Sequence, residues 1–333
     1  MLAVAIAPEP QQVLDVRDLR IEFPTRTYTV LAVDGVSFSI GRGEILGVVG
    51  ESGAGKSLTG NALIGLLQPP GRIASGSIWL SGKRIDDLAA AEQRKIRGRR
   101  IGAVFQDPLT SLDPLFTVGQ QLIETIRTHL PLSSAGARER ALQLLREVGI
   151  AAPEQRLDQY PHQFSGGMRQ RIVIALAIAG EPELIVADEP TTALDVSVQA
   201  QIIALLKRLA ESHGTAIMLI THDIGVIAET ADRIAVMYAG RLVEVGPVDN
   251  VVKRPRHPYT AGLMASIPSL ARRDVRLTQI DGAMPQPGAL PEGCAFAPRC
   301  PKAGPRCQRE RPVLVEAGGT KAACFLFQGG TGG

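Results

Sequence analysis

The sequence lacks any strong excess of charge of one sign. Its 36 Lys and Arg residues against 33 Asp and Glu leave a net charge of +3, which is too small a bias to argue for a nucleic acid or an anionic membrane surface as a partner. Long apolar runs are missing as well, since "RIVIALAIAG" and "PELIVADEP" are interrupted by charge or proline before the ~20 residues that a transmembrane helix needs. We therefore expect a soluble globular protein with no nucleic-acid partner.

Cysteine is absent from most of the chain, and the 4 cysteines all follow residue 290. The N-terminal "MLAVAIAPEP" has no basic residue and soon meets proline, so we expect a tail rather than an export signal. Without such a signal the chain is expected in a reducing cytoplasm. There, disulfides are disfavoured and a cysteine cluster is more often a metal site.

The pattern of the remaining chain predicts an α/β fold. The first 45 residues alternate apolar and polar positions, as in "VLDVRDLRIEF", which indicates two or three antiparallel strands. Buried strands are expected at "LIVAD" and "AIMLITHD", and a charged, helical stretch indicates an inserted helical subdomain at about 107–170. Proline-rich segments then mark an irregular C-terminal extension, so we divide the chain into domains 1–250 and 251–333.

A glycine-rich segment, "GESGAGKS", lies between an apolar strand and an amphipathic helix and fits the phosphate-loop pattern G-x-x-x-x-G-K-[ST]. Backbone N–H groups of such a loop cradle phosphates, the lysine supplies a cation, and the serine hydroxyl ligates Mg²⁺. The alternative is a chance glycine-rich turn, which the strand–loop–helix context disfavours. The predicted nucleotide-binding residues are Gly50, Glu51, Ser52, Gly53, Ala54, Gly55, Lys56 and Ser57.

Two carboxylates, Asp188 and Glu189, end the apolar run "ELIVAD" and so stand at the tip of a predicted buried strand. Ligands of α/β sheets bind at such tips. We expect Asp188 to hold Mg²⁺ and Glu189 to orient or deprotonate the attacking water. The alternative is that both residues only begin the following helix as its cap and first-turn acid.

The order of the P-loop, "FSGGM", "LIVADEP", "TALD" and "ITHD" resembles the nucleotide-binding domain of ABC transporters. "FSGGM" is similar to the family signature LSGGQ, with Ser165, Gly166 and Gly167 retained and both ends substituted. By itself, Ser-Gly-Gly before a helix is an anion-binding helix start or a flexible turn. The resemblance implies the fold of that family, namely a P-loop core, an antiparallel β subdomain and a helical insertion.

The resemblance also assigns roles to single residues. It implies that Gln106 reaches Mg²⁺ and the attacking water and senses the membrane subunit, that Asp195 communicates across a dimer, and that His222 contacts the γ-phosphate. A lone histidine after a strand would otherwise more often be structural or exposed. An aromatic side chain stacks on adenine in this family, and Phe23 fits best by position, with Tyr28 as the alternative; simple packing of both is nearly as good an explanation.

The segments "VFQDPLTSLDPLFTVGQQ", "YPHQFSGGMRQR" and "RHPYTAGLMASIP" resemble the ATPase subunits of bacterial oligopeptide and dipeptide importers, in particular the dipeptide-permease type. The resemblance implies an ATPase whose sites form between the P-loop of one subunit and the signature motif of another. The second subunit is a related chain, as in the dipeptide-permease type, or alternatively a copy of this chain. It implies two transmembrane permease subunits, a periplasmic or extracellular peptide-binding protein as an indirect partner, and a peripheral position on the cytoplasmic face of the inner membrane. Related transporters of nickel, glutathione or antimicrobial peptides share these motifs, and a soluble ABC ATPase outside transport is a further alternative.

The four cysteines lie close together in the C-terminal extension. The spacing of Cys294, Cys300, Cys307 and Cys324 is compatible with a zinc site or a [4Fe–4S] cluster, although the gaps are longer than those of most zinc knuckles. The family resemblance favours [4Fe–4S], with zinc as the alternative. The basic residues around the cysteines, Arg299 among them, could offset the charge of a cluster or form a solvated surface. We expect this module to lie outside the ATPase machinery.

Overall fold

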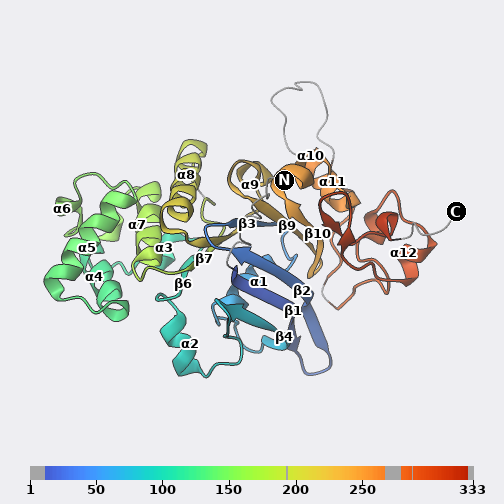
Figure 1. The fold of residues 1–333 in the computed structure, drawn as a ribbon, viewed down its shortest axis with the longest axis horizontal. Coiled ribbons are helices and arrows are strands. Elements are labelled where there is room, and N and C mark those ends of the chain that lie inside the picture. The colour runs from blue at the N-terminus through green and yellow to red at the C-terminus, as the bar shows by residue number, and fades with distance from the viewer. Residues whose placement is uncertain (1–11, 193, 267–278, 287, 329–333) are drawn as a thin grey trace, which may run out of the picture.

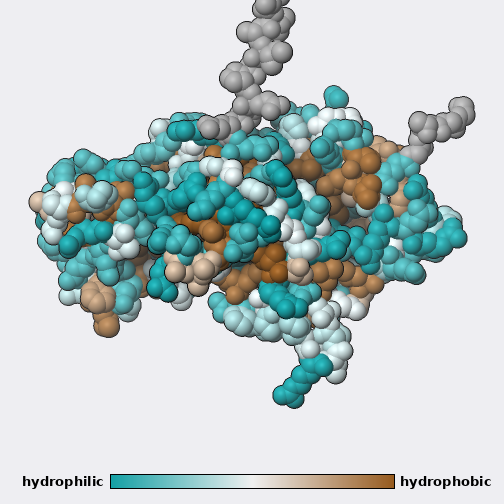
Figure 2. All heavy atoms as spheres, turned by 60° about the horizontal axis from the view of Figure 1, so that its bottom comes forward, coloured by the Kyte–Doolittle hydropathy of each residue, from teal (hydrophilic) through white to brown (hydrophobic). Residues whose placement is uncertain are grey.

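The computed structural model describes residues 12–192, 194–266, 279–286 and 288–328. The expected N-terminal tail and the last residues of the C-terminal extension lie outside these ranges. In the described chain, no helix is both long and apolar enough to span a bilayer. Figure 2 shows a mainly hydrophilic face that is interrupted by separate apolar patches.

The first strands form an antiparallel sheet, as predicted. In β1, Leu14, Val16, Leu19 and Ile21 are buried while the polar residues between them are more exposed. This alternation covers one face of the sheet with apolar side chains. The strand order is β2-β1-β4-β5. The strands are β1 (Gln12–Pro24), β2 (Thr29–Gly41), β4 (Arg72–Leu80) and β5 (Lys83–Arg84).

The main sheet has the order β11-β12-β10-β9-β3-β8-β7-β6. The strands from β9 to β6 pair in parallel, and β9, β10, β12 and β11 pair antiparallel. Predicted strands at "LIVAD" and "AIMLI" are confirmed as β7 and β8. The strands are β3 (Ile45–Val49), β6 (Ile101–Val104), β7 (Leu184–Asp188), β8 (Ala216–Ile220), β9 (Arg233–Tyr238), β10 (Arg241–Pro247), β11 (Val315–Glu316) and β12 (Lys321–Ala322).

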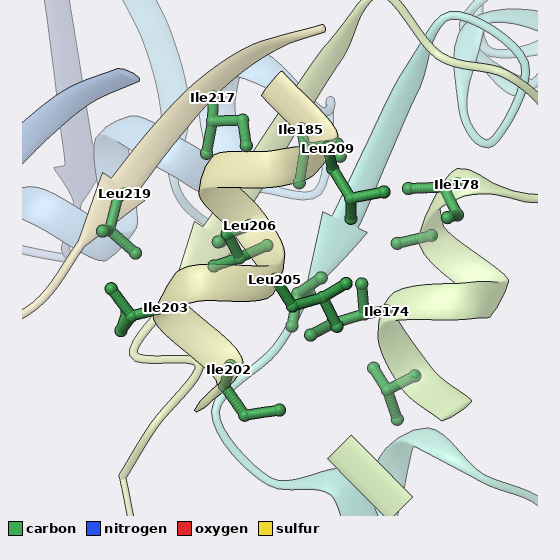
Figure 3. Packing of buried hydrophobic residues seen from close by; sticks show 14 of the residues in the cluster. Ile174, Ile178, Ile185, Ile202, Ile203, Leu205, Leu206, Leu209, Ile217 and Leu219 are labelled. Carbon is green, nitrogen blue, oxygen red and sulfur yellow. The ribbon is translucent and has the colours of Figure 1, made fainter. Parts of the chain in front are cut away.

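Both faces of the parallel strands β3, β6, β7 and β8 are buried, which explains why these strands read as continuous apolar runs. Val186 and Met218 face the antiparallel sheet, whereas Ile185 and Ile217 face the cluster that includes Leu206 of α8. Figure 3 shows Leu206 among these side chains, between the sheet and α7. The helices beside the two sheets are α1 (Lys56–Leu63), α2 (Ala90–Ile96), α8 (Val196–His213), α9 (Ile224–Thr230), α10 (Val248–Lys253) and α11 (Pro258–Ala265).

A group of helices lies between β6 and β7 in the sequence and forms one end of the molecule, drawn in green in Figure 1. It occupies the region where the charged helical pattern predicts an insertion. Thr117 caps α4 by accepting from Gln120 N–H, while the Gln120 side chain accepts from Thr117 N–H. The elements are α3 (Pro108–Ser111), α4 (Val118–His129), α5 (Ser134–Glu147), α6 (Pro153–Arg156), η1 (Pro161–Gln163) and α7 (Gly166–Ile178).

The C-terminal module comprises the described residues that follow position 250, namely 251–266, 279–286 and 288–328. It lies toward the opposite end of the molecule (Figure 1). Its strand β12 pairs with β10, so the module extends the main sheet rather than standing apart from it. The fully buried carboxylate of Glu244 accepts hydrogen bonds from the N–H groups of Arg256 and His257 and from the Thr320 hydroxyl. The other elements of the module are η2 (Ala297–Arg299), α12 (Pro305–Arg309) and η3 (Phe325–Phe327).

Candidate functional site

The predicted phosphate loop connects β3 to α1 at the carboxyl end of the sheet. Gly50, Gly53 and Gly55 have φ values of 154°, 83° and 99°, which residues with a Cβ rarely adopt. At Gly50 a Cβ would also meet the carbonyl oxygen of Met237 at 2.2 Å. The turn therefore requires glycine, and residues 50–57 form one compact loop.

Lys56 lies over this loop and is nearly buried. Its Nζ donates to the carbonyl oxygens of Gly50 at 2.8 Å and Glu51 at 3.1 Å. Burial lowers the pKa of Lys56, an effect that the charges of Glu189 and Asp188 oppose. A cation held by carbonyl groups beside exposed glycine backbone is suited to exchange these partners for phosphate oxygens.

Ser57 and Asp188 meet where the predicted magnesium site should lie. The Ser57 hydroxyl donates to Asp188 Oδ1 at 3.0 Å. Burial raises the pKa of Asp188, and the neighbouring charge of Glu189 acts in the same direction. A hydroxyl and a carboxylate are the oxygen ligands that Mg²⁺ accepts together with nucleotide phosphates, so these residues fit that ion.

Glu189 is the centre of a hydrogen-bond network. Its carboxylate accepts from Gln106 Nε2 at 3.2 Å and from the Thr192 hydroxyl at 2.9 Å, and it lies 3.2 Å from His222 Nδ1. Burial would raise the pKa of Glu189, but the hydrogen bonds from Thr192 and His222 outweigh burial and lower it. Its φ of 49° is in the left-handed region, where a residue other than glycine is strained.

The structure thus brings together Gln106, Glu189 and His222, which come from three distant segments. Together with Lys56 and Ser57 they combine a buried cation, oxygen ligands for Mg²⁺ and an ionised carboxylate. Such a set can bind a nucleoside triphosphate and orient a water molecule toward its last phosphorus. Sequence reasoning missed Thr192, although the segment "DEPTT" placed it three residues after Glu189.

The signature residues lie apart from this set, at the start of α7. Ser165 caps that helix by accepting from the Met168 N–H, and a Cβ on Gly167 would meet Val198 of α8 at 2.5 Å. Asp195 caps α8, and its hydrogen bond from the Val198 N–H helps to lower its pKa. In the described ranges, no hydrogen bond or ion pair joins Ser165, Gly166, Gly167 or Asp195 to the P-loop.

The two candidate adenine-stacking residues have different surroundings. Phe23 is half-buried and packs at the edge of the core, where a Cβ on Gly71 would meet its ring at 2.6 Å. The Tyr28 residue is 61% exposed. A role for either ring at adenine stays a prediction.

The four cysteines are free thiols that line one cavity of about 200 Å³ in the C-terminal module. Burial raises the pKa of Cys294, Cys300 and Cys324, and the charge of neighbouring cysteines adds to it. Metal binding requires thiolates at ligating distance. In the part of the chain that the structure describes, no three His, Cys, Asp or Glu side chains converge closely enough to hold a metal ion. The geometry therefore does not support the predicted metal site.

The expectations for Arg299 and for its module are wrong. Arg299 neither faces solvent nor turns toward the cysteines, because its side chain is 6% exposed and forms an ion pair with Glu51 of the P-loop at 3.0 Å. The module thus contacts the nucleotide site directly instead of lying outside it. The two residues are 248 positions apart, so no local pattern could have revealed the contact.

The family models match two parts of the chain. The model described as ABC transporter matches residues 33–192, and the model described as oligopeptide/dipeptide transporter, C-terminal region, matches residues 243–307. The first match contains the P-loop, the signature and both carboxylates. The second contains three of the cysteines.

Curated proteins and solved structures give the same result. The oligopeptide transport ATP-binding protein AppD of Bacillus subtilis is 45% identical over 95% of this chain and 97% of its own length. The dipeptide transport ATP-binding protein DppD of Escherichia coli is 45% identical over 93% of this chain and 95% of its own. A dimeric structure of the ATP-binding cassette MJ0796 bound to ADP and Pi aligns with a TM-score of 0.63 and 30% identity, covering 71% of this chain and 98% of that one.

Proposed function

Because this chain belongs to the ATP-binding subunits of the oligopeptide/dipeptide ABC transporters, we propose that it hydrolyses ATP to energise the import of di- or oligopeptides. The single observation that carries the proposal is the network around Glu189, which joins Gln106 and His222 beside the P-loop. A carboxylate fixed by hydrogen bonds at a strand tip next to a phosphate loop is suited to act on water.

In this proposal each side chain has one task. The P-loop and Lys56 bind the phosphates, while Ser57 and Asp188 hold Mg²⁺, which neutralises the charge that develops on them. Glu189 accepts hydrogen bonds from Gln106 and His222, so its carboxylate stays ionised and oriented toward the attacking water. The residues that hold the water and those that hold the phosphates come from neighbouring strands, which fixes their geometry.

The complete site requires a second ATPase subunit. Ser165, Gly166, Gly167 and Asp195 lie at the starts of α7 and α8, away from the P-loop of their own chain, and we propose that they face the P-loop of a partner. The dimeric arrangement of the structurally similar cassette supports this assignment. We propose a related chain as the partner, two permease subunits that hold the pair at the cytoplasmic face of the inner membrane, and a peptide-binding protein that delivers the substrate.

Transport by the reconstituted assembly tests the substrate class. The chain, its partner ATPase and the permease subunits are reconstituted in proteoliposomes. The peptide-binding protein and labelled di- and oligopeptides are added outside, ATP is enclosed inside, and peptide uptake into the vesicles is measured. We expect ATP-dependent peptide uptake and no uptake of nickel or glutathione. Uptake of one of these instead of peptide would contradict the peptide assignment, and a chain that purifies without membrane subunits would contradict the transport role.

A finer proposal concerns the C-terminal cysteines. The four thiols line one cavity, and we propose that the module rearranges to bring them to ligating distance of a [4Fe–4S] cluster, with zinc as the alternative. Anaerobic purification followed by iron, sulfide and zinc analysis tests this proposal. About four iron and four sulfide per chain, with absorption near ~400 nm, are expected. A colourless, metal-free protein would rule out both metals.

A further inference from the structure

The C-terminal module contacts the P-loop at Glu51 through hydrogen bonds. Arg299 Nη1 donates to both carboxylate oxygens of Glu51, at 3.1 and 3.0 Å. The backbone N–H of Glu51 donates to the hydroxyl of Tyr259 at 2.9 Å. One loop residue is thus held through its side chain and its backbone by two residues that follow it by more than 200 positions.

Arg299 itself is fixed in place. Its Nε donates to the carbonyl oxygen of Asp281 at 2.9 Å and its Nη2 to that of Ile280 at 3.2 Å, while Nη1 also lies 3.3 Å from the Tyr238 hydroxyl. The guanidinium carbon is 5.8 Å from the centre of the Tyr238 ring. A planar guanidinium with every edge occupied can hold its partner in one position, which the flexible ammonium of lysine would not do.

Tyr259 is equally rigid. It is fully buried, and its ring lies 4.6 Å from that of Tyr238 and 5.4 Å from that of Phe296. The three rings pack at the junction between the module and β9. Met284 adds a further contact, since a Cβ on Gly53 of the P-loop would lie 3.1 Å from its Cε. The P-loop therefore packs against rigidly held side chains of the C-terminal module.

Charge gives this contact a consequence for nucleotide binding. Glu51 places a carboxylate in the loop that must receive the negatively charged phosphates of ATP, so an unpaired Glu51 would repel them. Arg299 neutralises that carboxylate and draws it away toward the module. The same contact fixes the loop backbone, so less conformational freedom is lost when the phosphates bind.

We propose that Tyr259 and Arg299 are positioning residues of the ATP site, through which the C-terminal module preorganises the P-loop and neutralises Glu51. The inference rests on the proposed use of this P-loop as the ATP site. It assigns to the module a part in ATP affinity that does not depend on whether the module binds a metal.

ATP affinity of the full-length chain tests the proposal, with a fluorescent ATP analogue and Mg²⁺ as the probe. We expect Arg299→Gln to raise the dissociation constant about tenfold, because the unpaired Glu51 carboxylate would repel the phosphates and the loop would be less ordered before binding. In the assembled transporter the same variant should raise KM for ATP and leave kcat at saturating ATP nearly unchanged. Tyr259→Phe, which removes a single oxygen atom, should weaken ATP binding in the same direction.

Arg311→Gln is the matched control, because Arg311 also joins the module to the core, by an ion pair of 3.7 Å with Asp34, but away from the P-loop. It should leave the dissociation constant unchanged. If Arg299→Gln and Tyr259→Phe also bind ATP as tightly as the unaltered chain, whatever their thermal stability, the contacts only fasten the module and the proposal is overturned.

Two further variants separate the possible failures. In a Glu51→Gln background, Arg299→Gln should have little additional effect, and a full tenfold loss there would show that Arg299 acts through another group. Lys56→Ala should abolish ATP binding. If Lys56→Ala binds ATP normally, the P-loop assignment itself fails; if only the Arg299 and Tyr259 variants bind normally, the positioning role alone fails.

Discussion

At the scale of single residues, the fixed position of Glu189 is the feature on which hydrolysis depends. Gln106, Thr192 and His222 all contact its carboxylate, and its backbone N–H donates to the carbonyl oxygen of Ile220 at 2.8 Å. The strained φ of Glu189 is maintained by these contacts. The hydrogen bonds from Thr192 and His222 lower the pKa of Glu189 against the effect of burial, which keeps its carboxylate ionised at neutral pH.

Replacing this carboxylate tests its role. Glu189→Gln keeps the size of the side chain and its capacity to accept hydrogen bonds but removes the base, so we expect kcat for ATP hydrolysis to fall about 100-fold or more. ATP binding should persist, and the ATP-bound dimer should accumulate in size-exclusion chromatography. Glu211→Gln, at an exposed position of α8, is the matched control. Substantial steady-state hydrolysis by Glu189→Gln would remove Glu189 from its proposed role.

At the scale of elements, close backbone contacts set the distance between the helices and the main sheet. β6 and α7 approach each other at Gly102, where a Cβ would lie 2.3 Å from the carbonyl oxygen of Ala177. Because β6 leads into Gln106 and α7 begins with the signature residues, this contact aligns two parts of the site. The two elements can lie this close only because Gly102 has no side chain.

A single methyl group should therefore push β6 and α7 apart. We expect Gly102→Ala to lower the free energy of unfolding by about 1–3 kcal/mol, the usual cost of overpacking a core. In Gly136→Ala on α5, the Cβ would meet nothing closer than 3.5 Å, so that control should be neutral or stabilising by up to about 1 kcal/mol. Urea denaturation measures both, and an equal stability of the two variants would contradict the packing argument.

At the scale of the whole molecule, the C-terminal module and the ATPase core are joined by a common sheet and by the buried carboxylate of Glu244. β12 adds to the edge of β10, and the carboxylate of Glu244 binds N–H groups at the start of the module. The module is thus attached at three places: the sheet edge, the Glu244 anchor and the P-loop.

Loss of the anchor should loosen the module before the core. Glu244→Ala leaves two N–H groups without their acceptor, and each buried unpaired donor costs about 1–3 kcal/mol. We expect a loss of about 3 kcal/mol in stability and faster proteolytic release of a C-terminal fragment. Glu316→Ala, at an exposed position in the same module, should behave like the unaltered chain. Identical cleavage of both variants would show that Glu244 does not hold the module.

Much of this molecule could be predicted from sequence, because its active groups follow strand tips or begin helices within short motifs. Asp188 and Glu189 lie at the end of the apolar strand β7, and Lys56 follows the apolar strand β3 within a recognisable loop motif. These apolar segments predict the strands and hence the positions of the three residues. The joining of β12 to the sheet could not be predicted, since a strand of two residues leaves no periodic signal. Nor could the pair Glu51–Arg299, because both residues have ordinary surface chemistry and only the tertiary fold brings them together.

The contact between Glu51 and Arg299 also has a consequence for the order of events during synthesis. A ribosome makes Glu51 of the phosphate loop 248 residues before Arg299. Domains fold as they emerge, N-terminal parts first. The nascent chain can therefore pair strands β3, β6, β7, β8, β9 and β10 while Arg299 is still inside the ribosome. If Arg299 positions the loop as we propose, we expect full affinity for ATP only after that residue has emerged and paired with Glu51.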